Sequence, residues 1–302
     1  MKSLLKLGLL GAIFAMMPRS SAEAYCLMTT ESSNSNDADG CVMEGELVRW
    51  RRPCIALSLD DRGSRDLDSP RVRAAIERSF RAWMEIDCGG GLPAFNVRLN
   101  DATTRCQYAG FDFNGPNANT IAFVDNFEEE GYDATAFAVT IVWYSVETGE
   151  IFDGDLLINE DFAPYTICSD SGCEGDEIDL INVLTHEAGH FFGLAHSDVI
   201  PATMYRLAPR GEIEKRSLHP DDREGFYALY SEPLNPSCSF SPIGGLADRC
   251  AGDAPPPTKN GRCDASGGEF AGSLLPLAFV LFLYRLWLGG RIKRALHPTA
   301  RA

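Results

Sequence analysis

A run of histidines in the second half of the chain constrains its fold more than any other feature. His186 and His190 are four residues apart, and Glu187 directly follows the first of them. On a helix, side chains four residues apart project from one face about one turn apart. Gly193 can adopt the left-handed conformation that ends a helix, and the resulting turn would bring His196 back toward the other two histidines. We therefore predict a helix, a tight turn and three converging imidazoles.

This arrangement suits a catalytic zinc ion. Three neutral histidines leave one position of a tetrahedral Zn²⁺ open for water, whereas structural zinc sites use four protein ligands. The spacing predicts His186, His190 and His196 as the ligands of one zinc ion, with Glu187 facing the ion without binding it. An ordinary buried helix with hydrogen-bonded histidines is the alternative. Against it, three of the five histidines in the chain fall within this short motif.

The motif resembles that of the metzincin zinc endopeptidases, and Ser197 directly after the third histidine resembles the matrixin branch. The segment Ala202–Tyr205 resembles the methionine turn of this family, in which the methionine, here Met204, lies beneath the zinc as an apolar floor. Further on, Asp221–Tyr230 resembles the matrixin C-terminal helix, with its Asp-Asp start and Leu-Tyr end. The resemblance covers roughly residues 47–230.

The resemblance implies an α+β fold of the metzincin type, with a twisted, mostly parallel mixed sheet, two long helices and a C-terminal helix. It also implies an exported zinc endopeptidase that hydrolyses peptide bonds of extracellular or envelope proteins. Glu187 would act as general base toward a zinc-activated water, without a covalent intermediate. A surface-attached binding protein with a degenerate metalloprotease domain is the alternative, and the intact Glu187 argues against it.

Hydrophobic spacing predicts the elements that support the motif. A long helix should begin with Ser69 as its N-cap and Pro70 as its first residue, and the catalytic helix should begin at Asp176-Glu177. Strands are expected at 50–59, 94–99, 119–124, 136–144 and 151–158.

The last of these strands carries a prediction about substrate. Residues 148–159 resemble the edge strand of bacterial matrixin-like proteases, which pairs with an extended polypeptide through main-chain hydrogen bonds. We therefore expect substrate to add to Ile151, Phe152, Asp153, Gly154 and Asp155. Asp153 and Asp155 should point to one side of the strand, where they either hold a structural cation or are solvated.

A second acidic stretch, 125–133, either binds Ca²⁺, as matrixins commonly do, or is a solvated loop. The oxygen-ligand spacing of a known calcium loop is missing, which favours the solvated loop.

The ends of the chain indicate export. Residues 1–24 have two lysines, an apolar run at 7–17 and Ala22-Glu23-Ala24, as in a cleavable secretory signal. All ten cysteines follow this segment, which predicts disulfides in a protein that is secreted or held at the cell envelope. Cys168 and Cys173 can close a small loop, and the remaining connectivity stays open. The net charge of −16 argues against a nucleic-acid partner, and we expect a monomer.

We divide the remainder into a leader at 25–46, the protease domain at 47–232, a Pro/Gly/Cys-rich linker or disulfide-tied element at 233–272 and a tail at 273–302. The tail has a short apolar run, 274–288, followed by basic residues. It resembles C-terminal sorting tails of bacterial, notably myxobacterial, secreted proteins and predicts membrane attachment, although Pro276 and Arg285 interrupt the run. A buried helix is the alternative.

Latency is unexplained by the sequence. Matrixins are often kept inactive by a propeptide cysteine within a Pro-Arg-Cys-Gly type motif, and no such motif precedes the domain. Cys26 or Cys41 can in principle bind the zinc, but their use in disulfides is favoured.

Overall fold

The computed structural model describes residues 25–31, 41, 44–86, 95–251 and 292–298 of the 302-residue chain. The predicted signal at 1–24, the second half of the predicted linker and the apolar run at 274–288 lie outside the described residues. Among the described helices, none is both long enough and apolar enough to cross a membrane.

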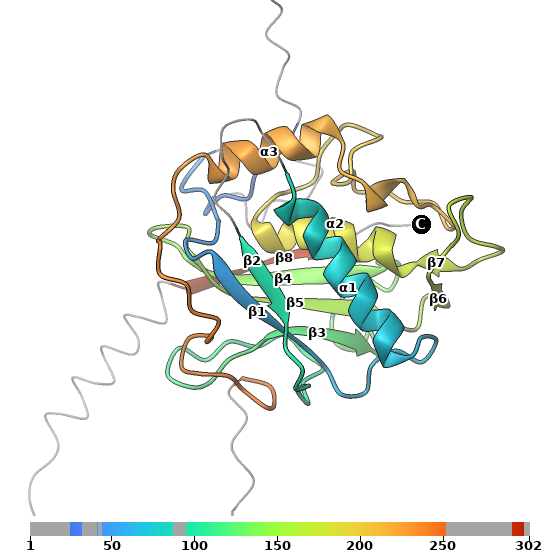
Figure 1. Ribbon diagram of the computed structural model, residues 1–302, viewed down its shortest axis with the longest axis horizontal. Helices are drawn as coiled ribbons and strands as arrows, with labels where there is room; N and C mark the ends of the chain where they lie inside the picture. The colour runs from blue at the N-terminus through green and yellow to red at the C-terminus, as the bar shows by residue number, and fades with distance from the viewer. Residues whose placement is uncertain (1–24, 32–40, 42–43, 87–94, 252–291, 299–302) are drawn as a thin grey trace, which may run out of the picture.

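A mixed sheet of six strands lies at the centre of the described structure, in the order β2-β1-β3-β5-β4-β8 (Figure 1). Strands β2, β1, β3 and β5 run parallel, β4 is antiparallel to β5, and β8 is antiparallel to β4. The strands are β1 (Cys54–Leu59), β2 (Asn96–Leu99), β3 (Asn119–Val124), β4 (Ala138–Ser145), β5 (Ile151–Asn159) and β8 (Ile292–Pro298).

Two helices, α1 (Ser69–Met84) and α2 (Leu180–Phe192), cross the same face of this sheet (Figure 1). A third helix, α3 (Pro220–Tyr230), follows the short 3-10 helix η3 (Glu214–Arg216). The small parallel pair β6 (Tyr165–Thr166) and β7 (Ile178–Asp179) leads into α2. The predicted α+β architecture, with a mixed sheet, two long helices and a C-terminal helix, is confirmed.

The start of α1 shows how local chemistry sets a helix end. Asp68 is the N-cap, because its carboxylate accepts the backbone N–H of Arg71 at 2.9 Å. Ser69 is therefore the first helical residue. Its hydroxyl had suggested that it would be the cap. Pro70 lies in the first turn, where its missing N–H costs nothing. The prediction was wrong by one residue.

The start of α2 was also predicted too early. Asp176 and Glu177 precede β7, and the cap is Asp179, whose carboxylate accepts the N–H of Asn182 at 2.7 Å. Pairing between β6 and β7 keeps the chain extended up to this point. Tertiary pairing has therefore overridden the helix-start signal of the earlier acids.

Apolar side chains fill both sides of the sheet. The larger core lies between the sheet and the helices, where rings from α1, α2 and α3 pack edge to face or tilted, among them Phe80, Trp83, Phe192, Phe226 and Tyr230. A smaller core covers the opposite face and includes Val124, Phe127, Ile141 and Leu157. The helical layer is thus held rigidly against the sheet.

Strand β5 is not at the edge of the sheet, so this prediction was wrong. It pairs with β3 through Leu156–Asn159 on one side and with β4 through Ile151–Ile158 on the other, so it is an interior strand. The consecutive apolar residues Leu156, Leu157 and Ile158 are all buried. Such a run is typical of an interior strand covered on both faces. It argues against an edge strand more strongly than the resemblance of residues 148–159 argues for one.

Four disulfides tie the described segments together. They join Cys26–Cys41, Cys54–Cys238, Cys106–Cys250 and Cys168–Cys173, the last as expected. Two of them attach residues 233–251 to the domain, one to Cys54 in β1 and one to Cys106 between β2 and β3. The same residues also pair through backbone bonds such as Asn117 N–H to Gly245 O at 2.9 Å. The described part of the predicted linker is therefore packed on the domain.

Two buried carboxyl groups lie side by side on β5. Asp153 and Asp155 are 0% and 1% exposed, so the solvated alternative is wrong. Asp155 accepts the N–H groups of Thr120 at 2.8 Å and Gly110 at 3.0 Å, yet burial raises its pKa to about 7. Burial and the neighbouring Asp155 raise the pKa of Asp153 well above its usual range, against the opposing effect of Arg52.

This pair should make stability depend on pH. The folded chain keeps a proton that the unfolded chain releases near pH 4, so the free energy of unfolding should fall as the pH rises from about 4 to about 7. Asp153→Asn removes one of the two charges. Between about pH 4 and about pH 7, its free energy of unfolding, measured with urea, should fall by on the order of 2 kcal/mol less than that of wild type. Exposed Asp101→Asn is the control, and a parallel pH dependence of all three proteins would refute the assignment.

Candidate metal centre and catalytic site

Helix α2 positions most of the site, and two tryptophans hold it through two of its backbone carbonyls. All its residues are buried, including His186, Glu187 and His190. The indole N–H of Trp83 donates to Thr185 O at 2.8 Å, and the indole N–H of Trp50 donates to Phe191 O at 2.8 Å. Because these bonds use backbone carbonyls on either side of the two histidines, the helix cannot rotate without breaking them.

The turn after α2 returns the third histidine. Gly193 has φ of 104°, as predicted for a left-handed cap. A Cβ there would overlap the carbonyl of Val48, so the close approach also requires glycine. The leader holds the outgoing chain, since Ala195 N–H donates to Cys26 O at 2.9 Å and Met28 N–H donates to Gly193 O at 2.9 Å. The leader is therefore part of the wall behind the turn.

The three histidines converge. One nitrogen from each of His186, His190 and His196 lies within 4.8 Å of the other two, and Nε2 of His190 is 3.2 Å from Nε2 of His196. Two nitrogens bound to one tetrahedral zinc at about 2.05 Å would be about 3.3 Å apart. Within the described residues, this is the only group of three or more His, Cys, Asp or Glu side chains close enough to share an ion.

The hydrogen bonds of the rings fix which nitrogens can bind a metal. Nδ1 of His186 lies 2.6 Å from Thr203 O, and Nδ1 of His190 lies 2.8 Å from Leu194 O. A carbonyl oxygen only accepts, so both Nδ1 atoms carry the proton and both Nε2 atoms present a lone pair. This is the tautomer that a metal-ligating histidine needs when its other nitrogen is anchored. The donor set fits a zinc ion.

Met204, in the segment that resembles a methionine turn, lies under α2. It is 1% exposed, and a Cβ at Gly189 would overlap its sulfur and the ring of Trp83. The glycine inside the motif therefore allows the turn to approach the helix. Ser197 N–H donates to Met204 O at 2.9 Å, so the turn is also joined to the residue that follows His196.

Asp222 holds the methionine turn from α3. Its two oxygens accept the backbone N–H groups of Thr203 at 2.8 Å and Met204 at 2.9 Å. The neighbouring Asp221 accepts the hydroxyl of Ser197 at 2.6 Å. The Asp-Asp pair was identified only by resemblance, and the structure supplies its role: it fastens the two segments that flank the histidines.

Thr140 on β4 contacts the motif carboxylate. Its hydroxyl is 2.5 Å from Oε2 of Glu187 and 3.2 Å from the carbonyl oxygen of the same residue. Thr140 was not among the site residues predicted from the sequence. The available signal was a hydroxyl in the middle of an otherwise apolar run, Ala138–Trp143, because a buried polar side chain needs a partner.

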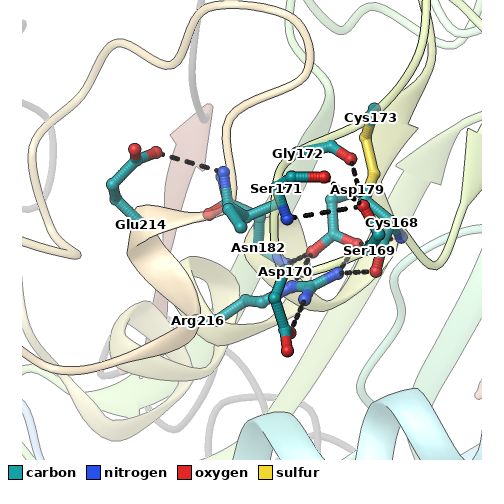
Figure 2. The surroundings of a disulfide bond; sticks show 11 residues. Cys168, Ser169, Asp170, Ser171, Gly172, Cys173, Asp179, Asn182, Glu214 and Arg216 are labelled. Carbon is teal, nitrogen blue, oxygen red and sulfur yellow. Dashed lines mark hydrogen bonds and ion pairs between the residues drawn. A yellow bond between two sulfur atoms is a disulfide. The ribbon is translucent and has the colours of Figure 1, made fainter.

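A buried ion pair anchors the start of α2 (Figure 2). Arg216 from η3 binds both carboxylate oxygens of Asp179, at 2.7 and 2.5 Å, and donates to Cys168 O at 2.8 Å. The Arg216 side chain is 8% exposed and that of Asp179 is 0% exposed. The hydrogen bond with Asp179 raises the pKa of Arg216. The small disulfide loop, the helix start and the segment after the methionine turn thus meet at one point.

The predicted substrate strand does not line the site as expected. Gly154 passes beneath α2, since a Cβ there would overlap the ring of Phe191. Because strand side chains alternate, Asp153 and Asp155 point to the opposite face of the sheet, away from the histidines. The strand nearest to Glu187 is β4, through Thr140.

The acidic stretch at 125–133 contributes to ion pairs. Asp125 lies 3.3 Å from Arg65 and 3.7 Å from Arg62. Calcium is not shown there.

Comparisons with known proteins agree with the geometry. The matrixin (Peptidase_M10) family model matches residues 49–231. The chain is 28% identical to metalloendoproteinase 1-MMP of Arabidopsis thaliana over 242 residues, which cover 78% of this chain and 57% of that protein. It is 25% identical to interstitial collagenase of Oryctolagus cuniculus over 228 residues, 73% of this chain and 41% of that protein. The chain spans about half the length of these curated relatives, and the bacterial subgroup stays a prediction.

Removing the buried ion pair should loosen the start of α2. Arg216→Ala leaves the Asp179 charge buried and unpaired, which should lower the free energy of unfolding by about 3 to 5 kcal/mol. Arg216→Lys keeps the charge but cannot bind both oxygens, so its loss should be smaller. Urea unfolding measures both. Exposed Arg78→Ala in α1 is the control, and an equal loss in Arg216→Ala and Arg78→Ala would contradict the anchoring role.

Proposed function

The chain belongs to the matrixin family, and from this premise we propose that it is an exported zinc endopeptidase acting on extended polypeptides. One observation carries the proposal. Three imidazoles with nitrogens within 4.8 Å of one another lie beside a buried carboxylate, Glu187, whose helix also carries two of the imidazoles.

We propose His186, His190 and His196 as the ligands of one zinc ion. Bound there, the ion supplies a Lewis acid that acidifies water and polarises the scissile carbonyl. The two anchored Nδ1–H groups hold the rings of His186 and His190 with Nε2 toward the centre. Met204 closes the floor with an apolar side chain that makes no demand for a polar partner.

Glu187 is the proposed general base. Its carboxylate would take a proton from the attacking water and return it to the leaving amine, which are the two proton transfers that peptide hydrolysis requires. The Thr140 hydroxyl orients the carboxylate by donating to Oε2. The proposed mechanism needs no covalent intermediate, so Ser197 is not a nucleophile. Its hydroxyl donates to Asp221 and accepts the N–H of Val199 at 3.1 Å.

Strand β4 is the proposed partner of the substrate backbone. It carries Thr140, which contacts Glu187, so a polypeptide aligned along β4 passes close to the proposed base. Strand β5, assigned this role from the sequence, lies between β3 and β4, whereas the outer edge of β4 is covered by β8 alone. An extended substrate that adds to β4 would be held by main-chain hydrogen bonds. The protein residues next to its side chains would set the sequence preference.

Export is supported by the disulfides. Four are formed among the described residues, and such bonds persist in oxidising compartments outside the cytoplasm. Secretion or retention at the envelope, the monomeric state and membrane attachment through the tail stay predictions.

The metal and the base can be separated by experiment. The purified protein should contain about one zinc per chain. Glu187→Gln should keep the zinc and lose at least about 100-fold in the hydrolysis of denatured casein, because proton transfer is lost while the ligands remain. His190→Ala should lose the zinc as well. Unchanged hydrolysis in Glu187→Gln would remove it from the mechanism. A zinc-loaded protein that lacks hydrolysis even when its chain ends at residue 291 would favour the binding-protein alternative.

Thr140 should act through Glu187 as a positioning residue. Thr140→Val keeps the shape and removes the hydroxyl, so kcat should fall about tenfold or more, the value of a hydrogen bond to a charged group. KM and zinc content should stay unchanged, and Thr140→Ser should recover most of kcat. A loss that appears in KM instead, or no recovery with serine, would mean that the residue only supports the fold.

A further inference from the structure

A segment near the C-terminus pairs with the outer edge of β4. Strand β8, Ile292–Pro298, runs antiparallel to β4 along nearly its whole length, with Ile292 opposite Ser145 and Pro298 opposite Val139. Figure 1 shows β8, in red, beside β4. With β5 on the other side, both edges of β4 are occupied.

The pairing passes the catalytic residues. His297 is in register with Thr140, the residue whose hydroxyl contacts Glu187. The backbone of β8 therefore runs past β4 at the position where the proposed base is held. A polypeptide that added to β4 beside Glu187 would use this same stretch of edge.

Strand pairing is exclusive. Each outward N–H and C=O of β4 can pair with one neighbouring strand only, since adjacent strands lie about 4.8 Å apart in the hydrogen-bonding direction. Substrate and β8 therefore cannot both pair with residues 139–145. One must leave before the other binds.

We propose that residues 292–298 occupy the substrate edge of the protease, so that the chain blocks its own catalytic site until this strand is displaced. The inference rests on the proposed function and adds its regulation. It also supplies a source of latency that needs no cysteine, because Cys26 and Cys41 are joined to each other. Being part of the same chain, the strand competes at a high effective concentration without tight binding.

A pair of prolines tests the proposal in the full-length protein. Of two successive residues in a strand, one directs its N–H toward a given neighbour, so Arg294→Pro with Ala295→Pro removes a pairing donor in either register. If β8 occupies the edge for more than nine-tenths of the time, kcat/KM on denatured casein should rise at least about tenfold in this variant. Equal kcat/KM in wild type and the proline pair overturns the proposal.

The matched control changes the same positions and keeps both N–H groups. Arg294→Val with Ala295→Val favours a strand, so its kcat/KM should equal or fall below that of wild type. Zinc content and urea unfolding confirm that each variant is folded. A chain ending at residue 291 is the second active form and should match the proline pair. An activation by the valine pair as large as that by the proline pair overturns the proposal, because the effect would then come from the side chains.

A binding measurement needs no catalysis. A fluorescein-labelled peptide of residues 291–299 is added to the proline-pair and valine-pair variants, each carrying Glu187→Gln. Its affinity should be at least about tenfold higher for the proline pair, where the edge is open. Equal affinities overturn the proposal. If the affinities differ as expected but no variant hydrolyses casein, the proposed function fails, and the competition with substrate fails with it.

Discussion

The approach of the methionine turn to helix α2 is the contact on which the proposed metal centre depends. Met204 can lie under the helix only because Gly189 offers no Cβ, and the turn is held there by the carboxylate of Asp222. The carbonyl of Thr203, in the same turn, accepts from Nδ1 of His186 and so selects the nitrogen that faces the centre. One backbone segment thus sets the floor of the site and the tautomer of one of the proposed ligands.

The buried charged groups near the site fix the relative positions of chain segments more than they stabilise the fold. The ion pair of Asp179 and Arg216, like the carboxylate of Asp222, satisfies backbone or side-chain groups on two separate segments at once. A hydrophobic replacement could fill the same volume at lower desolvation cost, but it could not specify the register between α2, η3 and the methionine turn. Asp153 and Asp155 differ, because their mutual repulsion and burial oppose ionisation and they lie on the far face of the sheet.

Much of this arrangement could be predicted from the sequence, and the predictions that were wrong have physical causes. The αL conformation of Gly193, the helix with its two histidines and the strand at 119–124 follow from local spacing and were predicted correctly. The start of α2 and the place of β5 in the sheet depend on pairing between distant segments, which period and composition do not encode. Thr140 was missed because its importance comes from a contact with Glu187, 47 residues away.

The outer edge of β4 places two opposing demands on the chain. A bare edge next to the proposed catalytic site would invite pairing with any extended polypeptide, including another copy of the same protein. A permanently covered edge would exclude substrate. A strand from the same chain resolves the conflict only if its pairing is weak enough to be displaced. Residues 252–291 separate β8 from the rest of the described domain, and the entropic cost of joining two segments grows only slowly with the number of residues between them. The strength of closure is therefore set mainly by the few backbone bonds between β8 and β4, where a proline at residue 298 already removes one possible donor.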